Sequence, residues 1–142
     1  MSEILLLGYD GSDSANAALE HTVRLAPALG AEVVVVFAYY VSPLGGGEAY
    51  HDYRAALEEV GVHELKRAVV DLEAAGVSTT SRIEQGKAAE VILAVAEDVG
   101  ATTIVVGTVG ENPITGALLG SVVLKLVQRS SIPLLIVPTQ EG

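Results

Sequence analysis

The chain contains no cysteine, few basic residues and no long hydrophobic run, and each shortage excludes a class of protein. Without cysteine there is no disulfide, no thiolate metal site and no cysteine nucleophile. Eight lysines and arginines stand against eighteen aspartates and glutamates, and the net charge of −10 argues against generic binding to nucleic acid or anionic lipid. The basic side chains form no nucleic-acid-binding stripe, because they are scattered along the chain, as in Arg24, Lys66, Arg67, Lys125 and Arg129.

The hydrophobic residues predict a folded domain outside the membrane. The longest apolar run covers residues 33–41, whereas a membrane-spanning helix needs about 20 such residues. The 142 residues, of which 50% are hydrophobic, are enough for one domain with a buried core, which we expect over residues 1–142. Met1-Ser2-Glu3 contains no basic region of the kind that begins a signal peptide, so we expect a cytoplasmic protein.

Five short segments rich in valine, isoleucine, leucine or threonine alternate with four longer, helix-like segments. The short segments are apolar nearly throughout, which is typical of parallel strands buried on both faces. We expect these strands at residues 4–8, 33–38, 77–83, 103–107 and 134–137. The third is more polar than the others, which is typical of an edge strand. The alternation predicts an α/β fold, a three-layer sandwich with right-handed crossovers.

Apolar residues at helical spacing predict four helices between these strands. The first carries Ser12 or Asp13 as its N-cap and ends at Gly30, and Pro27 predicts a kink or an early end. The run Gly45-Gly46-Gly47 is expected to form a loop tip before the second helix. The apolar positions place the remaining helices at residues 57–75, 91–99 and 118–127.

Glycines gather where the fourth expected strand leads into the fourth helix. Gly107 and Gly110 are followed, after nine further residues, by Gly120-Ser121. Ligands of open α/β sheets bind beyond the carboxyl ends of the strands, and amides at a helix start bind phosphate. The segment is no Walker A loop, because the chain has no Gly-Lys-Ser/Thr. The spacing alone leaves two alternatives open: a phosphate site that uses the amides of Ser121 and Val122, or glycines that only make turns.

The segment Tyr9-Asp10-Gly11-Ser12 ends the first expected strand at the same edge of the sheet. Asp10 can accept hydrogen bonds from ribose hydroxyls or help to hold a divalent ion. Alternatively, the segment is a helix-capping turn, which Asp-Gly-Ser suits well. The three histidines suggest no other metal site, because no ligand spacing links His21, His51 and His63.

Four segments, in this order, resemble the universal stress protein family. They are residues 4–12 (Ile-Leu-Leu-Leu-Gly-Tyr-Asp-Gly-Ser), residues 100–107, the motif Gly107-x2-Gly110-x9-Gly120-Ser121, and residues 131–138. The glycine motif is similar to the one that marks the ATP-binding branch of that family. The resemblance implies a five-stranded parallel sheet in the order 3-2-1-4-5, a Rossmann-like fold similar to the adenine nucleotide alpha hydrolases. It also implies a homodimer built around the last strand, Pro133–Val137.

The resemblance further implies a stress-response regulator that binds ATP, ADP or AMP, with Mg as a possible companion of the nucleotide. Asp10 matches the aspartate near the ribose, where it could also reach a nucleotide-bound Mg, and Ala38 matches the position whose backbone meets the adenine. No catalytic residue is implied. The nucleotide-binding residues expected on this basis are Gly8, Tyr9, Asp10, Ala38, Val106, Gly107, Gly110, Gly120, Ser121, Val122 and Val123.

Three positions depart from the family pattern. Val109 and Glu111 stand where the family often has a basic residue or histidine, and Val123 stands where it often has serine or threonine. Each loses a donor to the triphosphate, and Glu111 adds a repelling charge. We therefore expect weak binding or a preference for fewer phosphates. Two rival functions remain: a slow ATPase, for which only Asp10 offers a polar group near the loop, and a homodimeric interaction module that has lost nucleotide binding.

Overall fold

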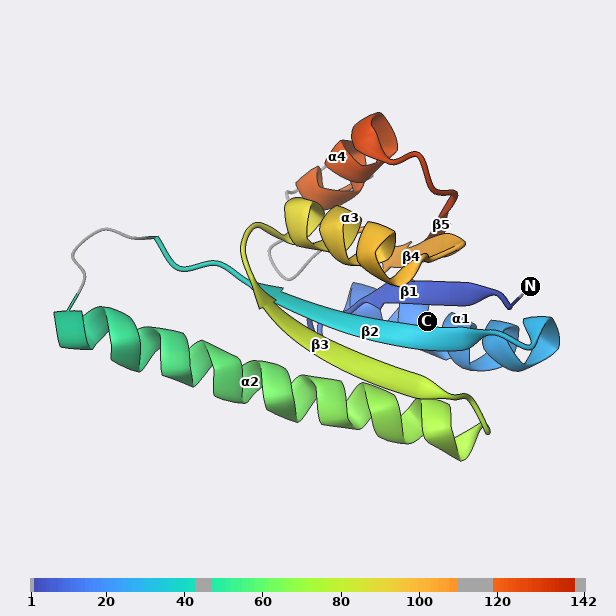
Figure 1. Ribbon diagram of the computed structural model, residues 1–142, viewed down its shortest axis with the longest axis horizontal. Coiled ribbons are helices and arrows are strands. Elements are labelled where there is room, and N and C mark those ends of the chain that lie inside the picture. The colour runs from blue at the N-terminus through green and yellow to red at the C-terminus, as the bar shows by residue number, and fades with distance from the viewer. Residues whose placement is uncertain (1, 43–46, 110–118, 140–142) are drawn as a thin grey trace.

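Five parallel strands form one sheet in the order β3-β2-β1-β4-β5 (Figure 1). The structure, a computed structural model, describes residues 2–42, 47–109 and 119–139. This order confirms the fold class expected from the sequence and places the polar strand β3 at an edge. The strands are β1 (Ile4–Gly8), β2 (Glu32–Tyr39), β3 (Thr79–Gln85), β4 (Thr103–Gly107) and β5 (Leu134–Val137).

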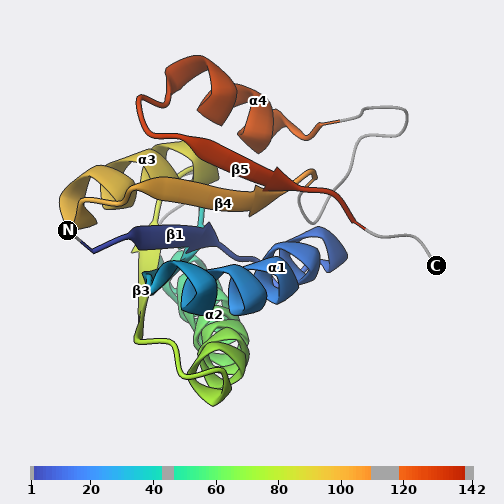
Figure 2. The same ribbon diagram turned by 90° about the vertical axis from the view of Figure 1, so that its right-hand side faces the viewer.

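Four helices connect the strands and cover both faces of the sheet. They are α1 (Asp13–Leu29), α2 (Gly47–Ala74), α3 (Ala88–Val99) and α4 (Ser121–Arg129). Figures 1 and 2 show α1 and α2 on one face and α3 and α4 on the other. The chain therefore forms three layers, as the alternation of strands and helices predicts.

Strand side chains alternate between the two helical layers, and this alternation builds two hydrophobic cores. Leu5 and Leu7 of β1 and Val105 of β4 pack with α1 and α2, whereas Leu6 and Ile104 pack with α3 and α4. All five side chains are 0% exposed. Because both faces are covered, no position of these central strands needs a polar residue, which explains why they are apolar throughout.

Helix α1 begins and ends at residues that the sequence indicates. The Ser12 hydroxyl accepts a hydrogen bond from the Ala15 amide at 3.1 Å, and Gly30 adopts the left-handed conformation at φ 64°. The helix continues through Pro27 to Leu29, so the prediction of an early end was wrong. Proline lies in the last turn, where its missing amide removes a single intrahelical hydrogen bond.

Helix α2 is longer than expected, because Gly47 begins it rather than ending a loop. Its buried residues, Gly61, Leu65, Ala68 and Leu72, all lie in its second half. The first half, residues 47–60, projects beyond the ends of β2 and β3 (Figure 1). This half therefore lacks the apolar residues that repeat on the buried face of a helix, and the periodicity of the sequence underestimates the length of α2.

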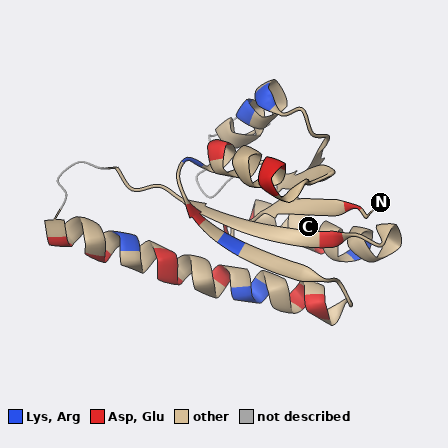
Figure 3. Ribbon diagram, viewed as in Figure 1, with Lys and Arg blue, Asp and Glu red and all other residues tan. Residues whose placement is uncertain are grey.

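The edge strand β3 carries a charged cluster. Arg82 pairs with Glu84 on its own strand at 2.9 Å and with Asp98 of α3 at 2.7 Å. Figure 3 shows these charges at the edge of a sheet whose central strands β1 and β4 carry none. Across the described ranges, no helix combines the length and the hydropathy that crossing a membrane requires.

The core predicts a clear stability difference between two leucines. Leu7 is 0% exposed in the sheet, whereas Leu29 at the end of α1 is 45% exposed. We expect Leu7→Ala to lower the free energy of unfolding by about 2–5 kcal/mol, because it removes buried methyl groups and leaves a cavity. Leu29→Ala should change it by less than about 1 kcal/mol. Urea denaturation followed by circular dichroism measures both, and equal losses would contradict the described core.

Candidate functional site

A cleft opens at the carboxyl edge of the sheet, where β1 and β4 lie side by side. From β1 the chain passes to α1 on one face, and α4, which follows β4, covers the other (Figure 2). In open α/β sheets, ligands bind at such a reversal of strand order. The cleft is lined by Gly8, Tyr9, Asp10, Ala15, Val36, Ala38, Ala88, Ile92, Val106, Gly107, Val109, Gly120, Val122 and Val123.

Most residues that the sequence proposes for nucleotide binding come together in this cleft. They are Gly8, Tyr9, Asp10, Ala38, Val106, Gly107, Gly120, Val122 and Val123. Two do not appear in the lining: Gly110 lies outside the described residues, together with Glu111, and Ser121 is exposed at the start of α4. Val123 is 3% exposed and packs with Leu126 in the core, so it contributes to the apolar floor.

Val109, which the sequence analysis places beside the phosphates, also lines the cleft, whereas four further walls, Ala15, Val36, Ala88 and Ile92, were not predicted. Ala88 begins α3 directly after β3, at the same carboxyl edge, and this position in the order of elements could have indicated it. Ile92 belongs to the buried face of α3, and nothing in its spacing separates a cleft wall from an ordinary core residue. The apolar walls favour a flat, uncharged group over a strongly hydrated one.

Asp10 forms the capping turn that its sequence allows, and it also lines the cleft. Its Oδ1 accepts a hydrogen bond from the Ser12 amide at 3.0 Å, and Ser12 in turn caps α1. The segment is therefore a capping turn, and Asp10 also lines the cleft. Among the described residues of the lining, Asp10 is the only carboxylate.

Tyr9 anchors the start of this turn. Its ring is 3% exposed and packs with the α1/α2 core, and its hydroxyl donates to Asn16 Oδ1 at 2.6 Å. Burial raises the pKa of Tyr9 above its ordinary value; Arg67 opposes this increase, whereas Glu64 adds to it. The tyrosine therefore stays neutral at physiological pH. Its phenol is committed to the core of the protein rather than to a ligand in the cleft.

The start of α4 offers amide donors to the cleft. Gly120 is its N-cap at φ −73° and ψ 165°, and no side chain caps the helix among the described residues, in contrast to Ser12 at α1. The Gly120 amide itself donates to the Thr108 carbonyl at 2.7 Å. Since the first amides of a helix have no intrahelical partner, those after Gly120 are suited to an anion.

Packing requires a glycine at position 107, for a reason that the sequence alone does not reveal. A Cβ atom there would overlap Ser14, whose carbonyl carbon lies 2.6 Å from the position it would take. The hydroxyl of Ser14, a residue that is 2% exposed, accepts a hydrogen bond from the Val109 amide at 3.1 Å. Ser14 thus ties the segment after β4 to the first turn of α1, and Gly107 permits this close approach.

Comparison with known proteins identifies the family of the chain. The family model of the universal stress proteins matches residues 1–138. The chain belongs to the universal stress protein family. It is 36% identical over 142 residues to the universal stress protein in the QAH/OAS sulfhydrylase 3'region of Thermus aquaticus, an alignment that covers 96% of this chain and 99% of the relative.

Solved structures of universal stress proteins share this architecture. A structure of hypothetical protein MJ0577 superposes with a TM-score of 0.90 at 25% identity, covering 100% of this chain and 99% of that one. A universal stress protein in complex with cAMP superposes with a TM-score of 0.73 at 30% identity, covering 98% of each chain. The family resemblance of the sequence is thereby confirmed.

Loss of the hydrogen bond between Ser14 and the Val109 amide should lower the free energy of unfolding measurably. Ser14→Ala removes the acceptor of the Val109 amide, and an unmet hydrogen bond at a part-buried position costs about 1–3 kcal/mol. Ser81→Ala, on the exposed surface of β3, is the matched control and should stay within about 0.5 kcal/mol of the unmodified protein. Urea denaturation measures both, and identical values for the two variants would show that this hydrogen bond adds no stability.

Proposed function

We propose that this protein binds an adenine nucleotide in the cleft between β1 and β4 and acts as a nucleotide-responsive regulator in the cytoplasm. One observation carries the proposal: an apolar cleft at the reversal of strand order adjoins a helix start that no described side chain caps. An apolar wall suits a base, and a helix start suits a phosphate. The solved relative in complex with cAMP, at 30% identity, supports an adenine nucleotide as the ligand.

In the proposed binding mode, each part of the nucleotide meets a different element. The base lies against the walls formed by Ile92 and Val106 and is recognised by main-chain groups near Ala38. Asp10 accepts hydrogen bonds from the sugar hydroxyls. The phosphate is held by the amides that follow Gly120, whose helix start carries a partial positive charge.

The charge of the cleft favours a nucleotide with few phosphates. The phenol of Tyr9 belongs to the core. Asp10 is therefore the only other ionisable residue among the described residues that line the cleft. The described part of the lining contains no lysine, arginine or histidine. Val109 and Val123 supply apolar groups where the family often supplies donors. We therefore expect AMP or cAMP to bind at least as tightly as ATP, and a magnesium ion to contact the protein through Asp10 alone.

The described lining favours binding of the nucleotide without hydrolysis. Phosphoryl transfer needs a positioned base and cationic stabilisation of the transferring group. Asp10 is the only candidate base in the lining, and its Oδ1 is already bonded to the Ser12 amide. A single-turnover assay with excess protein over labelled ATP separates a regulator from a slow ATPase.

We also propose that two copies associate through β5. This strand is a bare edge of the sheet, and all four of its residues, Leu134–Val137, are only half-buried. On α4, which follows β4 and packs beside β5, Leu124 is 48% exposed and Val127 is 54% exposed. A second copy would cover this apolar edge and supply its missing hydrogen bonds.

Nucleotide binding is tested by thermal shift and titration calorimetry. We expect cAMP, AMP and ATP each to raise the melting temperature more than GTP does. Gly120→Val should lower the affinity for AMP at least about tenfold, a loss of 1.4 kcal/mol, because the side chain enters the phosphate space. The backbone of Gly120 lies in the ordinary extended region, so the fold should persist. Ala55→Val on exposed α2 is the control, and equal affinity of both variants would contradict the proposal.

The dimer is tested by placing a charge on one edge of the sheet at a time. Ile136→Lys should convert the dimer into monomers, because a lysine on β5 meets the same apolar edge of the second copy. Thr80→Lys on the opposite edge strand, β3, should leave the dimer intact. Size-exclusion chromatography with light scattering measures the mass, and circular dichroism verifies the fold. A monomeric unmodified protein, or dimeric Ile136→Lys, would exclude association through β5.

A further inference from the structure

The projecting half of α2 is held on one side by the ends of two strands. The Tyr39 hydroxyl donates to Glu58 Oε1 at 2.5 Å, and Arg54 pairs with the same carboxylate at 3.2 Å. Gln85, the last residue of β3, donates to the Tyr50 hydroxyl at 3.1 Å. Burial and the bond to Glu58 raise the pKa of Tyr39, so these contacts persist at physiological pH. The polar contacts fix one side of the helix, and among the described residues its other side is exposed.

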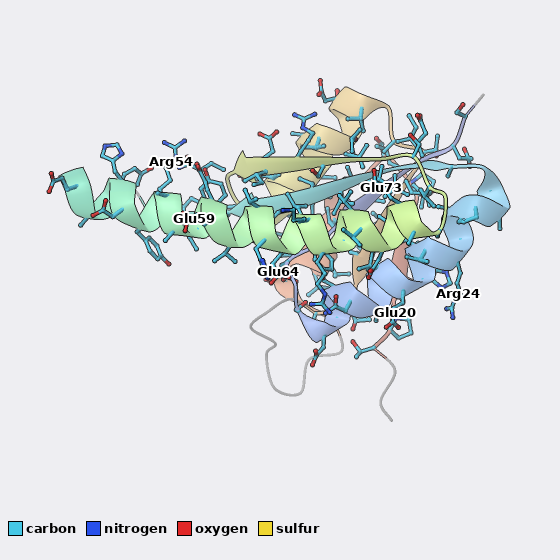
Figure 4. All side chains as sticks on the ribbon, turned by 90° about the horizontal axis from the view of Figure 1, so that it is seen from below. Glu20, Arg24, Arg54, Glu59, Glu64 and Glu73 are labelled. Carbon is cyan, nitrogen blue, oxygen red and sulfur yellow. The ribbon has the colours of Figure 1, made fainter. Side chains whose placement is uncertain are left out.

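A stripe of apolar residues follows that other side. It consists of Ala49, Tyr53, Ala56 and Val60, all of them exposed, with Tyr53 at 57% and Val60 at 50%. At roughly 100° per residue, these four positions lie within roughly 60° of one another, and Arg54 lies roughly 130° from their centre. In Figure 4, Arg54 extends from one side of α2 and Glu64, which continues the side of the stripe, from the other.

The spacing of the stripe fits the packing of a second helix. Its members stand four, three and four residues apart, which is the repeat through which helices pack along a shared seam. Small and large side chains alternate, so that Tyr53 and Val60 would act as knobs and the two alanines as holes. An extended strand has a repeat of two and could not follow this seam.

Acidic residues border the stripe and determine the charge of the partner. Glu48, Asp52 and Glu59 each directly precede a stripe residue, and all three are exposed. Figure 3 shows acidic residues along this half of α2, and its one arginine, Arg54, is paired with Glu58. A second copy of the chain would bring another acidic border against the first, at a net charge of −10 per copy. Lysine and arginine beside an apolar seam would match it.

We propose that the projecting half of α2 is a docking surface for an amphipathic helix of a partner protein, with basic residues flanking its apolar face. The surface lies on residues 47–60, beyond the sheet, and uses none of the residues that line the nucleotide cleft. It also uses neither β5 nor α4. The proposal is therefore independent of nucleotide binding and of the dimer, and each can fail without the others.

The probe is a synthetic three-heptad peptide with leucine along one seam and lysine at the flanking positions, labelled with fluorescein. The full chain is titrated into it, and anisotropy gives the affinity. Tyr53→Ser/Val60→Ser should weaken binding at least about tenfold, because the central aromatic and aliphatic anchors are lost without a change of charge. Val62→Ser/Val70→Ser removes equally exposed valines, at 57% and 58%, from other faces of α2 and should preserve binding within about twofold.

The remaining comparisons decide the chemistry of the partner. The same peptide with glutamate in place of lysine should not bind, and raising the salt concentration should weaken the lysine peptide. Equal binding by the two double variants, at unchanged helicity, would show generic attraction to an acidic protein and overturn the proposal. No binding of the lysine peptide would overturn it, as would a change of oligomeric state in Tyr53→Ser/Val60→Ser, which would assign the stripe to a second copy.

Discussion

The covering of both faces of one parallel sheet is the constraint on which the rest of the structure depends. Leu5, Leu6 and Leu7 are fully buried although successive side chains point in opposite directions, so helices must lie on both faces. The chain therefore has to change faces between β1 and β4. In open α/β sheets a crevice forms at such a reversal of strand order, and the cleft lies there. The position of the site thus follows from hydrophobic burial.

The glycines of the site differ in their structural reasons. Gly107 is required because Ser14 lies against its Cα, and this contact brings α1 beside β4. Gly120 has an ordinary backbone conformation, so its lack of a side chain does not serve the turn itself. A motif that looks uniform in the sequence therefore combines a glycine that packing requires, Gly107, with one that lines the cleft in an ordinary backbone conformation, Gly120.

The fold could be predicted from the sequence because each strand has a strong local signal. The apolar runs correctly indicated strands in a parallel sheet with helices on both faces, and the polar residues of β3 correctly indicated an edge strand, whereas the order of the strands came from the family resemblance. The lining of the cleft could be predicted where it coincides with the end of a strand, as at Asp10, or the start of a helix, as at Gly120, but not at residues such as Ile92, whose spacing is that of any core position.

The length of α2 escaped prediction for a different reason. Residues 47–60 are fixed by contacts that are distant in the sequence, such as Tyr39 with Glu58 and Gln85 with Tyr50. These contacts do not produce an apolar period that faces the core, so the helical signal begins near Leu57. An apolar period of about 3.6 residues indicates a helix with one buried face. A helix held on one side by polar side chains shows this period only in part.

The two edges of the sheet differ in a way that limits assembly. Arg82, with its partners Glu84 and Asp98, places charge along β3, and a strand approaching that edge would have to desolvate an ion-paired cluster. The other edge, β5, is apolar. A sheet with one permissive edge can be joined once by a symmetric copy and then has no edge left on which to grow. The contrast between one charged edge and one apolar edge thus stops further growth of the sheet after one association, which favours closed pairs over open fibres.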